Sequence, residues 1–328
     1  MTFVLNAKIA PTITETFAGT AQAAGFTVRR QVSLASLTTF KIGGPADLLI
    51  SVDRVDQLVR LVRLARAHGI SYLLLGGGSN VLIADAGIRG LVILNRCRQV
   101  TERTPEGPEG SPEAVHLVVE SGTPLAGLAR VAIHKGLAGL EWAVSVPGTV
   151  GGAVVGNAGA HGGCIADRLA EIQVLDGQDT LTTWPVTALQ YTYRNSRLRA
   201  AADPQAANAV VLVAEFHLVR GERSELEARA IRFLAHRRAT QPTTASVGSI
   251  FRNPPGDYAG RLIEAVGLKG TQVGQAQFSP VHANFLVNLG GATAHDVITA
   301  IRLAQDTVAA RFAVTLTPEI LFVGEFEA

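Results

Sequence analysis

Apolar residues recur at helical spacing early in the chain. In "RVDQLVRLVRLARAHG" (residues 54–69) they occupy positions 55, 58, 59, 62 and 65, and Gly69 follows the last of them. This period places the apolar side chains on one face, and glycine is typical of a helix C-terminus. The pattern predicts a helix, then a strand over 70–75, a glycine turn over 76–80 and more strand over 81–94. In open α/β sheets, ligands commonly bind beside such turns, at the C-terminal ends of the strands.

The same patterns predict the later elements. Apolar runs predict strands over 115–122, 170–177, 181–186 and 209–219. A helix is predicted at about 124–135, and another starts at Ser224, which forms a capping box with Glu227. Thr293 and Asp296 open a third helix, with Val297, Ile301, Ala304, Val308 and Phe312 on one face. The coarse prediction is an α+β protein in three parts, with boundaries near residues 95 and 220.

A long uncharged stretch raises the question of a membrane span. "WAVSVPGTVGGAVVGNAGAHGGCIAD" (142–167) has no charged residue before Asp167, and a span needs about 20 mostly apolar residues. Pro147 and the repeated glycines disfavour a helix, because each Gly costs roughly 1 kcal/mol and a Pro about 3. Asn157 and His161 would also need polar partners in lipid. The residue types predict buried, glycine-rich, non-helical backbone.

Composition excludes several classes of protein. The chain has 328 residues, of which 47% are hydrophobic and 17% charged, with a formal net charge of +2. That balance predicts no nucleic-acid partner. Cys97 and Cys164 are too few for a disulfide framework or a zinc site, so we expect a reducing cytosol and no metal. The first residues lack the basic and apolar regions of a secretory signal, so we expect a cytoplasmic protein. The segment 103–113, rich in Pro, Gly and Glu, predicts an exposed loop.

Two glycine-rich segments are candidate ligand sites. "GGGSN" (76–80) lacks both the dinucleotide fingerprint and the P-loop pattern. Taken alone, this segment is explained more simply as a tight turn than as a phosphate-binding loop. Together with "VPGTVGGAVVGNAGAHGG" (146–163), it could hold two sides of one large ligand, since glycine lets main-chain amides approach an anion. A pair of unrelated packing turns has equal weight at this point.

Four further residues have a structural and a functional interpretation. Arg194 in "YTYRNSR", Ser249 in "ASVGSIFRNPPG" and His282 in "SPVHANFLVN" are each explained most simply as structural groups. Ser249 has no Gly-x-Ser-x-Gly pattern around it, which disfavours serine hydrolase chemistry. Glu319 begins an apolar strand in "LTPEILFVGEF", where an unpaired charge is costly, so it is either paired or functional.

The ordered set of motifs resembles one known family, the UDP-N-acetylenolpyruvoylglucosamine reductases. The resemblance runs from about Thr38 to Glu325 and is carried by "TTFKIGG", "LGGGSNVLIAD", "GLEWAVSVPGTVGGAVVGNAGAHGG", "YRNS", "GSIFRNP", "GLKG", "HANFLVN" and "PEILFVGE". It implies an α+β fold, with a two-subdomain FAD-binding unit of the vanillyl-alcohol-oxidase type (1–95 and 96–220). A C-terminal α+β substrate-binding domain (221–328) follows, whose last strand returns to the flavin.

The resemblance also implies the site residues. Arg194, Ser249 and Glu319 become catalytic: Arg194 and Glu319 bind and polarise the carboxylate of an enolpyruvyl ether, and Ser249 donates a proton to the carbon beside the one that receives hydride. The implied flavin-binding residues are Gly76, Gly77, Gly78, Ser79, Asn80, Val81, Val146, Pro147, Gly148, Thr149, Gly151, Gly152, Asn157 and Ala158. The implied substrate-binding residues are Tyr193, Arg238, Asn253 and His282.

The implied reaction uses non-covalent FAD with NADPH as co-substrate, and reduces a UDP-sugar enolpyruvyl ether to UDP-N-acetylmuramate for peptidoglycan synthesis. We expect a monomer without nucleic-acid or membrane partners. The chain lacks the tyrosine loop that some members carry after the "YR-S" segment, which indicates the shorter subtype. His161 stands where many members have Tyr, Arg252 where many have Lys, and Gln241 in a region where the longer subtype has a lysine. An FAD-dependent oxidase of the same fold and a non-catalytic binding module remain alternatives.

Overall fold

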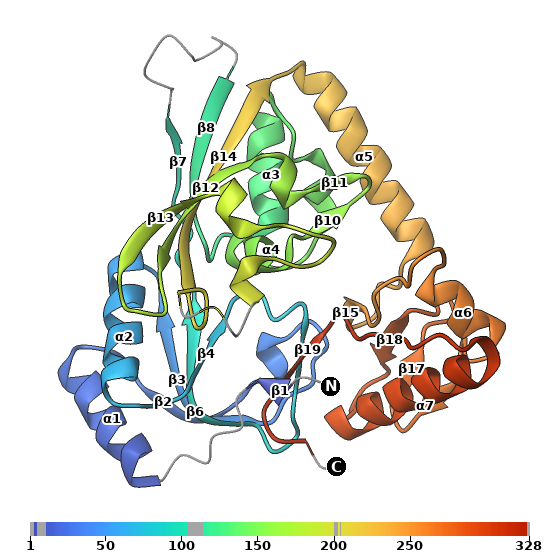
Figure 1. Ribbon diagram of the computed structural model, residues 1–328, viewed down its shortest axis with the longest axis horizontal. Helices are drawn as coiled ribbons and strands as arrows, with labels where there is room; N and C mark the ends of the chain where they lie inside the picture. Colours follow the sequence, from blue (N-terminus) through green and yellow to red (C-terminus); the bar gives the residue numbers. More distant parts are fainter. Residues whose placement is uncertain (1–2, 5–10, 104–113, 200–202, 204, 327–328) are drawn as a thin grey trace. The chain divides into compact units, whose positions relative to one another are not determined.

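The computed structural model describes residues 3–4, 11–103, 114–199, 203 and 205–326 (Figure 1). The chain divides into two units. The first comprises Met1–Ile50, Leu64–Leu94 and Arg238–Ala328, and the second comprises Ser51–Arg63 and Asn95–Arg237. The three-domain division at residues 95 and 220 stays a prediction, because one compact unit can comprise more than one domain. Among the described residues, no helix is long and apolar enough to cross a membrane.

Three sheets lie wholly or largely in the first unit. One has the order β2 (Arg29–Ser33), β3 (Pro45–Val52), β6 (Ile88–Asn95), β4 (Tyr72–Leu75). Another has the order β1 (Phe3–Val4), β19 (Leu321–Val323), β5 (Val81–Ile83), with parallel neighbours. The third has the order β15 (Ser246–Ser249), β18 (Phe285–Asn288), β17 (Ala276–Phe278), β16 (Gln272–Val273), with antiparallel neighbours. The β19–β5 pairing places Leu321 opposite Val81, so β19 lies beside the strand that follows the GGGSN turn.

The helices of the first unit are α1 (Pro11–Ala23), α6 (Ala259–Ala265) and α7 (Ala294–Phe312), with the 3₁₀ helix η1 (Ala35–Leu37). The prediction for α7 is confirmed, including its start. The Thr293 hydroxyl accepts a hydrogen bond from the Asp296 N–H, and the Asp296 carboxylate accepts one from the Thr293 N–H. Four of the five residues predicted on its apolar face are buried, and Phe312 packs partly buried against the same core.

A six-stranded antiparallel sheet forms the centre of the second unit. Its order is β13 (Leu181–Pro185), β12 (Leu169–Leu175), β14 (Val210–Arg220), β8 (Ala114–Glu120), β7 (Val100–Arg103), and β9 (Leu137–Ala138) also pairs with β14. Apolar residues of β8, β12 and β14 share one core with the helices α3 (Leu125–His134) and α4 (Val150–Gly156). A short hairpin, β10 (Gly159–Ala160) and β11 (Gly163–Cys164), follows α4. The 3₁₀ helices are η2 (Glu141–Ser145), η3 (Ile165–Asp167), η4 (Val186–Leu189) and η5 (Arg197–Arg199).

Two helices belong partly to each unit, namely α2 (Val55–Ala67) and α5 (Arg223–Thr240). The predicted helix over 54–69 is confirmed as α2. The capping box predicted at Ser224 is wrong, because α5 already begins at Arg223. The N–H groups of Glu225 and Leu226 donate to the Glu222 carbonyl, and the Glu227 carboxylate accepts from the Arg223 guanidinium instead.

The prediction of non-helical backbone over 142–167 is also wrong in part. Residues 150–156 form α4, in which Val150, Ala153 and Val154 are buried in the core of the second unit. Burial of this apolar face offsets the low helix propensity of the glycines, since tertiary packing routinely overrides propensity. Asn157 ends the helix in the left-handed conformation, with φ of 43°. The predicted loop over 103–113 lies almost wholly outside the described residues.

Candidate active site

The GGGSN turn of the first unit joins β4 to β5 and is held by two other segments. Gly78 has φ of +59°, and a Cβ there would lie 2.3 Å from the Leu37 carbonyl oxygen, so only glycine fits. The Thr39 N–H donates to the Gly78 carbonyl at 3.0 Å. The Leu321 N–H donates to the Asn80 carbonyl at 3.0 Å. The turn is therefore a rigid structure built from three distant stretches of sequence.

Two predicted catalytic residues, Ser249 and Glu319, are brought together within this unit. Ser249 ends β15, and the next residue, Ile250, accepts a hydrogen bond of 2.7 Å on its carbonyl from the Glu319 N–H. The Glu319 carbonyl in turn accepts from the side-chain amide of Asn80, at 3.3 Å. Both Ser249 and Glu319 are half-buried. Within the described part of the chain, the Ser249 hydroxyl makes no hydrogen bond, so it is available to a ligand.

The third predicted catalytic residue, Arg194, belongs to the second unit. Its segment, 191–196, is attached to α4 and the residues after it. The Tyr191 hydroxyl donates to the Val154 carbonyl at 2.8 Å, and the Ser196 hydroxyl donates to the Val155 carbonyl at 2.7 Å. Arg194 itself has φ of 56°, a conformation that costs about 1–3 kcal/mol outside glycine. Its Nη2 donates to the Gly159 carbonyl at 2.9 Å, so one side of the guanidinium is fixed.

Asn157 connects this segment to the glycine-rich stretch. Its side-chain amide donates to the Thr192 carbonyl at 3.1 Å, and its side-chain carbonyl accepts from the Ala166 N–H at 3.2 Å. Asn157 is 9% exposed and left-handed, so it serves both as helix terminus and as anchor for the Arg194 segment.

Replacing Asn157 tests that double role. Asn157→Ala should destabilise the protein by about 1–3 kcal/mol, because the half-buried Ala166 N–H and the exposed Thr192 carbonyl lose their hydrogen bonds and alanine disfavours left-handed backbone. Asn157→Gly loses the same hydrogen bonds but fits the backbone, so it should destabilise less. Urea unfolding of both variants measures the difference. A glycine variant as unstable as the alanine variant would contradict the role of the backbone conformation.

The second glycine turn, 146–149, and the first residues of α4 lie against residues that the sequence motifs do not include. The Val150 N–H donates to the Thr123 carbonyl at 2.9 Å, and the Gly151 N–H donates to the Ser121 carbonyl at 2.8 Å. Among the described residues, the buried hydroxyls of Thr123 and Ser145 have no hydrogen-bond partner. A buried hydroxyl without a protein partner is uncommon, and such a group is suited to bind a ligand or a water molecule. The glycine that follows strand β8 in "ESGTP" is the sequence signal that could have identified this turn.

The four predicted substrate-binding residues have different surroundings. The Asn253 side-chain carbonyl accepts from the Ala259 N–H at 3.1 Å, next to the start of α6. His282 Nδ1 accepts from the Asn284 N–H at 3.2 Å, which leaves the ring proton on Nε2, and burial lowers the pKa of His282. Arg238 is exposed near the end of α5, and Tyr193 is 60% exposed. Asn253, His282 and Arg238 belong to the first unit, and Tyr193 to the second.

Comparison with known proteins gives a consistent result. Residues 241–323 match the model for the C-terminal domain of UDP-N-acetylenolpyruvoylglucosamine reductase, and residues 46–184 match an FAD binding domain. A reductase of that name from Chloroflexus aggregans is 42% identical over 295 residues, 90% of this chain and 97% of that protein. One from Synechococcus sp. (strain RCC307) is 44% identical over 306 residues, 92% of this chain and 96% of that protein. The crystal structure of the Thermus caldophilus reductase (MurB) has a TM-score of 0.73 at 33% identity and covers 91% of this chain and 100% of that one.

These matches confirm the predicted fold class and the FAD cofactor. The two glycine turns also fit such a cofactor chemically. Among the described residues, the main-chain N–H groups of residues 77–80, of Gly148 and of Thr149 donate to no protein group. Clusters of free main-chain N–H groups are suited to phosphate oxygens. The partnerless hydroxyls of Thr123 and Ser145 are further groups that a bound cofactor could satisfy.

Proposed function

The chain belongs to the UDP-N-acetylenolpyruvoylglucosamine reductase family, and from this we propose that it reduces the enolpyruvyl ether of UDP-N-acetylglucosamine-enolpyruvate to UDP-N-acetylmuramate. FAD held by the residues named below would supply the redox chemistry that links NADPH to the substrate. The names of the relatives favour this reaction over that of an oxidase of the same fold. The proposal includes a monomeric protein that acts in the cytoplasm on a small-molecule substrate for peptidoglycan synthesis.

We assign cofactor binding to the residues of the two glycine turns. Residues 76–81 of the first unit, and residues 146–149, 151, 152, 157 and 158 of the second, would contact the diphosphate and the ribityl chain through main-chain groups. The support is the free N–H groups of residues 77–80, Gly148 and Thr149 in the described structure, and the fixed geometry of the GGGSN turn. Thr123 and Ser145 are added as hydroxyl donors, because both are buried without a partner in the described structure.

Arg194 and Glu319 would hold the substrate carboxylate. A guanidinium can donate two parallel hydrogen bonds to a carboxylate, and Arg194 already has one nitrogen fixed on the Gly159 carbonyl. Negative charge that builds on the substrate during hydride addition is stabilised when its partner is positioned in advance. Glu319 would share a proton with that carboxylate, and its main chain is held by Ile250 and Asn80.

Ser249 would donate the proton that completes the reduction. Serine is a weak acid, but the carbanionic substrate is a strong base, so transfer is feasible when the geometry is fixed. The single observation that carries this assignment is the position of Ser249 at the end of β15, next to Ile250, whose carbonyl accepts a hydrogen bond of 2.7 Å from the Glu319 N–H.

Tyr193, Arg238, Asn253 and His282 would bind the sugar nucleotide. Exposed Arg238 offers a cation for the diphosphate, and neutral His282 offers an Nε2–H donor. In the part of the chain that the structure describes, Asn253 uses only its side-chain carbonyl, which accepts from the Ala259 N–H, so its NH₂ would be available to a ligand.

The proposed function is tested by turnover with a defined product. The purified protein, NADPH and UDP-N-acetylglucosamine-enolpyruvate should yield a product heavier by two hydrogens, with one NADPH consumed per product. Mass spectrometry and absorbance at the NADPH band measure both quantities. No product with this substrate, from a flavin-loaded protein that NADPH does reduce, would contradict the proposal.

The cofactor should be bound without a covalent bond. Cys97 is buried, and burial raises the pKa of its thiol to about 12, which leaves it unreactive. Burial also raises the pKa of the Cys164 thiol. Acid or heat should therefore release intact FAD, one per chain, into the supernatant. Yellow colour that stays with the precipitated protein would contradict this prediction.

A further inference from the structure

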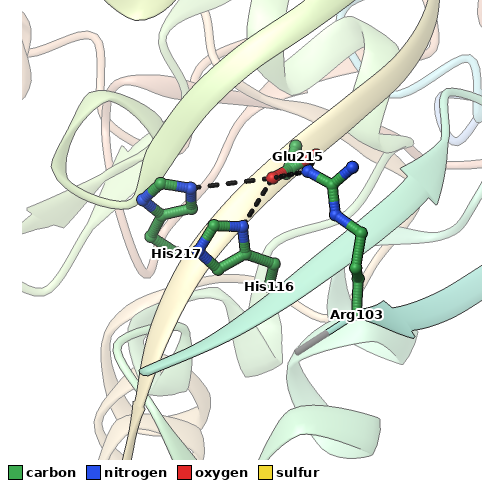
Figure 2. Close-up of polar contacts among 4 residues, drawn as sticks. All are labelled: Arg103, His116, Glu215 and His217. Carbon is green, nitrogen blue, oxygen red and sulfur yellow. Dashed lines mark hydrogen bonds and ion pairs between the residues drawn. The ribbon is translucent and has the colours of Figure 1, made fainter. Parts of the chain in front are cut away.

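A cluster of two histidines and one glutamate lies on the six-stranded sheet of the second unit, apart from every residue used above (Figure 2). His116 on β8 is the direct register partner of His217 on β14, and Arg103 on β7 is the register partner of His116. Glu215 precedes His217 by two residues, so both side chains lie on the same face of the sheet. Figure 2 shows the imidazoles and the guanidinium converging on the Glu215 carboxylate.

We propose that His116, Glu215 and His217 form a binding site for a first-row divalent transition-metal ion such as Zn²⁺. One ligand atom from each residue lies within 4.8 Å of the other two. Two imidazoles and one carboxylate are a preferred donor set for these ions, and water completes the coordination. The proposal is independent of the reductase activity.

The distances are close to those that coordination requires. Ligand atoms about 2.0–2.1 Å from a tetrahedral zinc ion lie about 3.3 Å apart. Here Glu215 Oε1 lies 2.7 Å from His116 Nδ1 and 3.7 Å from His217 Nε2, on either side of that separation. The rings are stacked with centroids 3.7 Å apart.

The strand register fixes the positions of the three ligand residues, and the His217 side of the site is open to solvent. All three ligand residues lie on β8 and β14, which pair over seven consecutive residues, so their spacing is fixed by main-chain hydrogen bonds. The His217 side chain is 52% exposed, which gives an ion access from solvent, while Glu215 is 9% exposed. A bound ion would join the two strands through their side chains.

Arg103 is the competitor for the carboxylate. Its Nη2 lies 2.8 and 2.9 Å from the two oxygens of Glu215, so an ion must displace it. The Arg103 side chain is 60% exposed and ends in solvent-accessible space, so it can move into water. This competition distinguishes a metal site from a purely structural ion-pair cluster, because it predicts that removing Arg103 strengthens metal binding.

The test is calorimetric titration of the FAD-loaded protein with ZnCl₂ at neutral pH in a buffer that does not bind zinc. One equivalent should bind at the cluster, and His217→Ala should weaken binding by about tenfold or more, since even outer partners of metal ligands contribute 10–100-fold. Arg103→Ala should bind zinc more tightly than the unchanged protein. His295→Ala, an exposed histidine in the first unit, is the matched control and should bind as the unchanged protein does.

Thermal unfolding shows whether a variant that binds zinc weakly is still folded. Zinc should raise the Tm of the unchanged protein and of His295→Ala, because a ligand of the folded state stabilises it, and should raise the Tm of His217→Ala by clearly less at the same zinc concentration. Absence of zinc binding by the unchanged protein would overturn the proposal. Equal zinc affinity in the unchanged protein and His217→Ala would do so as well, and so would weaker binding by Arg103→Ala.

Discussion

Ser249→Ala is expected to slow hydride transfer to the enolpyruvyl substrate by at least about 100-fold, because general acid catalysis contributes roughly 10²–10⁴-fold. The change removes one oxygen that makes no hydrogen bond in the described structure, so fold and FAD content should be unchanged. Flavin reduction by NADPH should also be unchanged. Anaerobic reoxidation of the prereduced variant by substrate, followed at the flavin absorbance, measures the affected step.

Ser246→Ala is the matched control for this prediction. Ser246 lies on the same strand β15 and is half-buried like Ser249, but no catalytic role is assigned to it. Reoxidation of the control should resemble that of the unchanged protein. A Ser249→Ala rate within a few-fold of that control would mean that Ser249 is not the acid and that the GSIF segment is only structural.

Arg194→Ala is expected to weaken the reaction with the sugar nucleotide by about 2–5 kcal/mol of transition-state binding, the range found when one partner of a hydrogen-bonded charge pair is removed. Flavin reduction by NADPH should change far less. The comparison of kcat/KM for the two half-reactions measures this separation.

Arg194→Lys controls for the loss of charge. It keeps the cation but loses the planar fork that binds a carboxylate with two hydrogen bonds, so it should recover only part of the activity. The variants also lose the hydrogen bond to the Gly159 carbonyl, and FAD content and Tm report on that structural effect. An equal loss in both half-reactions would make Arg194 a structural residue.

The elements predicted from the sequence are those with strong local signals. The helix α2 follows from a 3.6-residue apolar period, and α7 follows from Thr293 and Asp296 at its start. The glycine-rich α4 could not be predicted in this way. Its stability depends on Val150, Ala153 and Val154 packing into a core whose other members come from distant strands.

Local signals also misplaced details that depend on tertiary structure. Ser224 and Glu227 have the spacing of a capping box, but the helix starts earlier, and the Arg223 guanidinium binds Glu227. In the segment 279–288, whose apolar residues resemble a strand, only Phe285–Asn288 forms one. The Ser279 hydroxyl accepts hydrogen bonds from the Val281 and His282 N–H groups, which makes the first half a turn.

Identifying the candidate site required both the order of the sequence motifs and the structure. The resemblance supplied Arg194, Ser249 and Glu319, and the structure shows how Ser249 and Glu319 are held together through the Ile250 carbonyl. The His116, Glu215 and His217 cluster had no sequence signal. His116 and Glu215 are 99 residues apart, and only the register of β8 with β14 makes them neighbours.

The most direct test of the proposed reductase is a single measurement. The flavin-loaded protein is reduced with one equivalent of NADPH under strict exclusion of oxygen and then mixed with UDP-N-acetylglucosamine-enolpyruvate in a stopped-flow instrument. The account predicts rapid return of the oxidised flavin absorbance, with one molecule of substrate reduced per flavin. A flavin that stays reduced with this substrate but reoxidises rapidly when oxygen is admitted would contradict the account and indicate an oxidase.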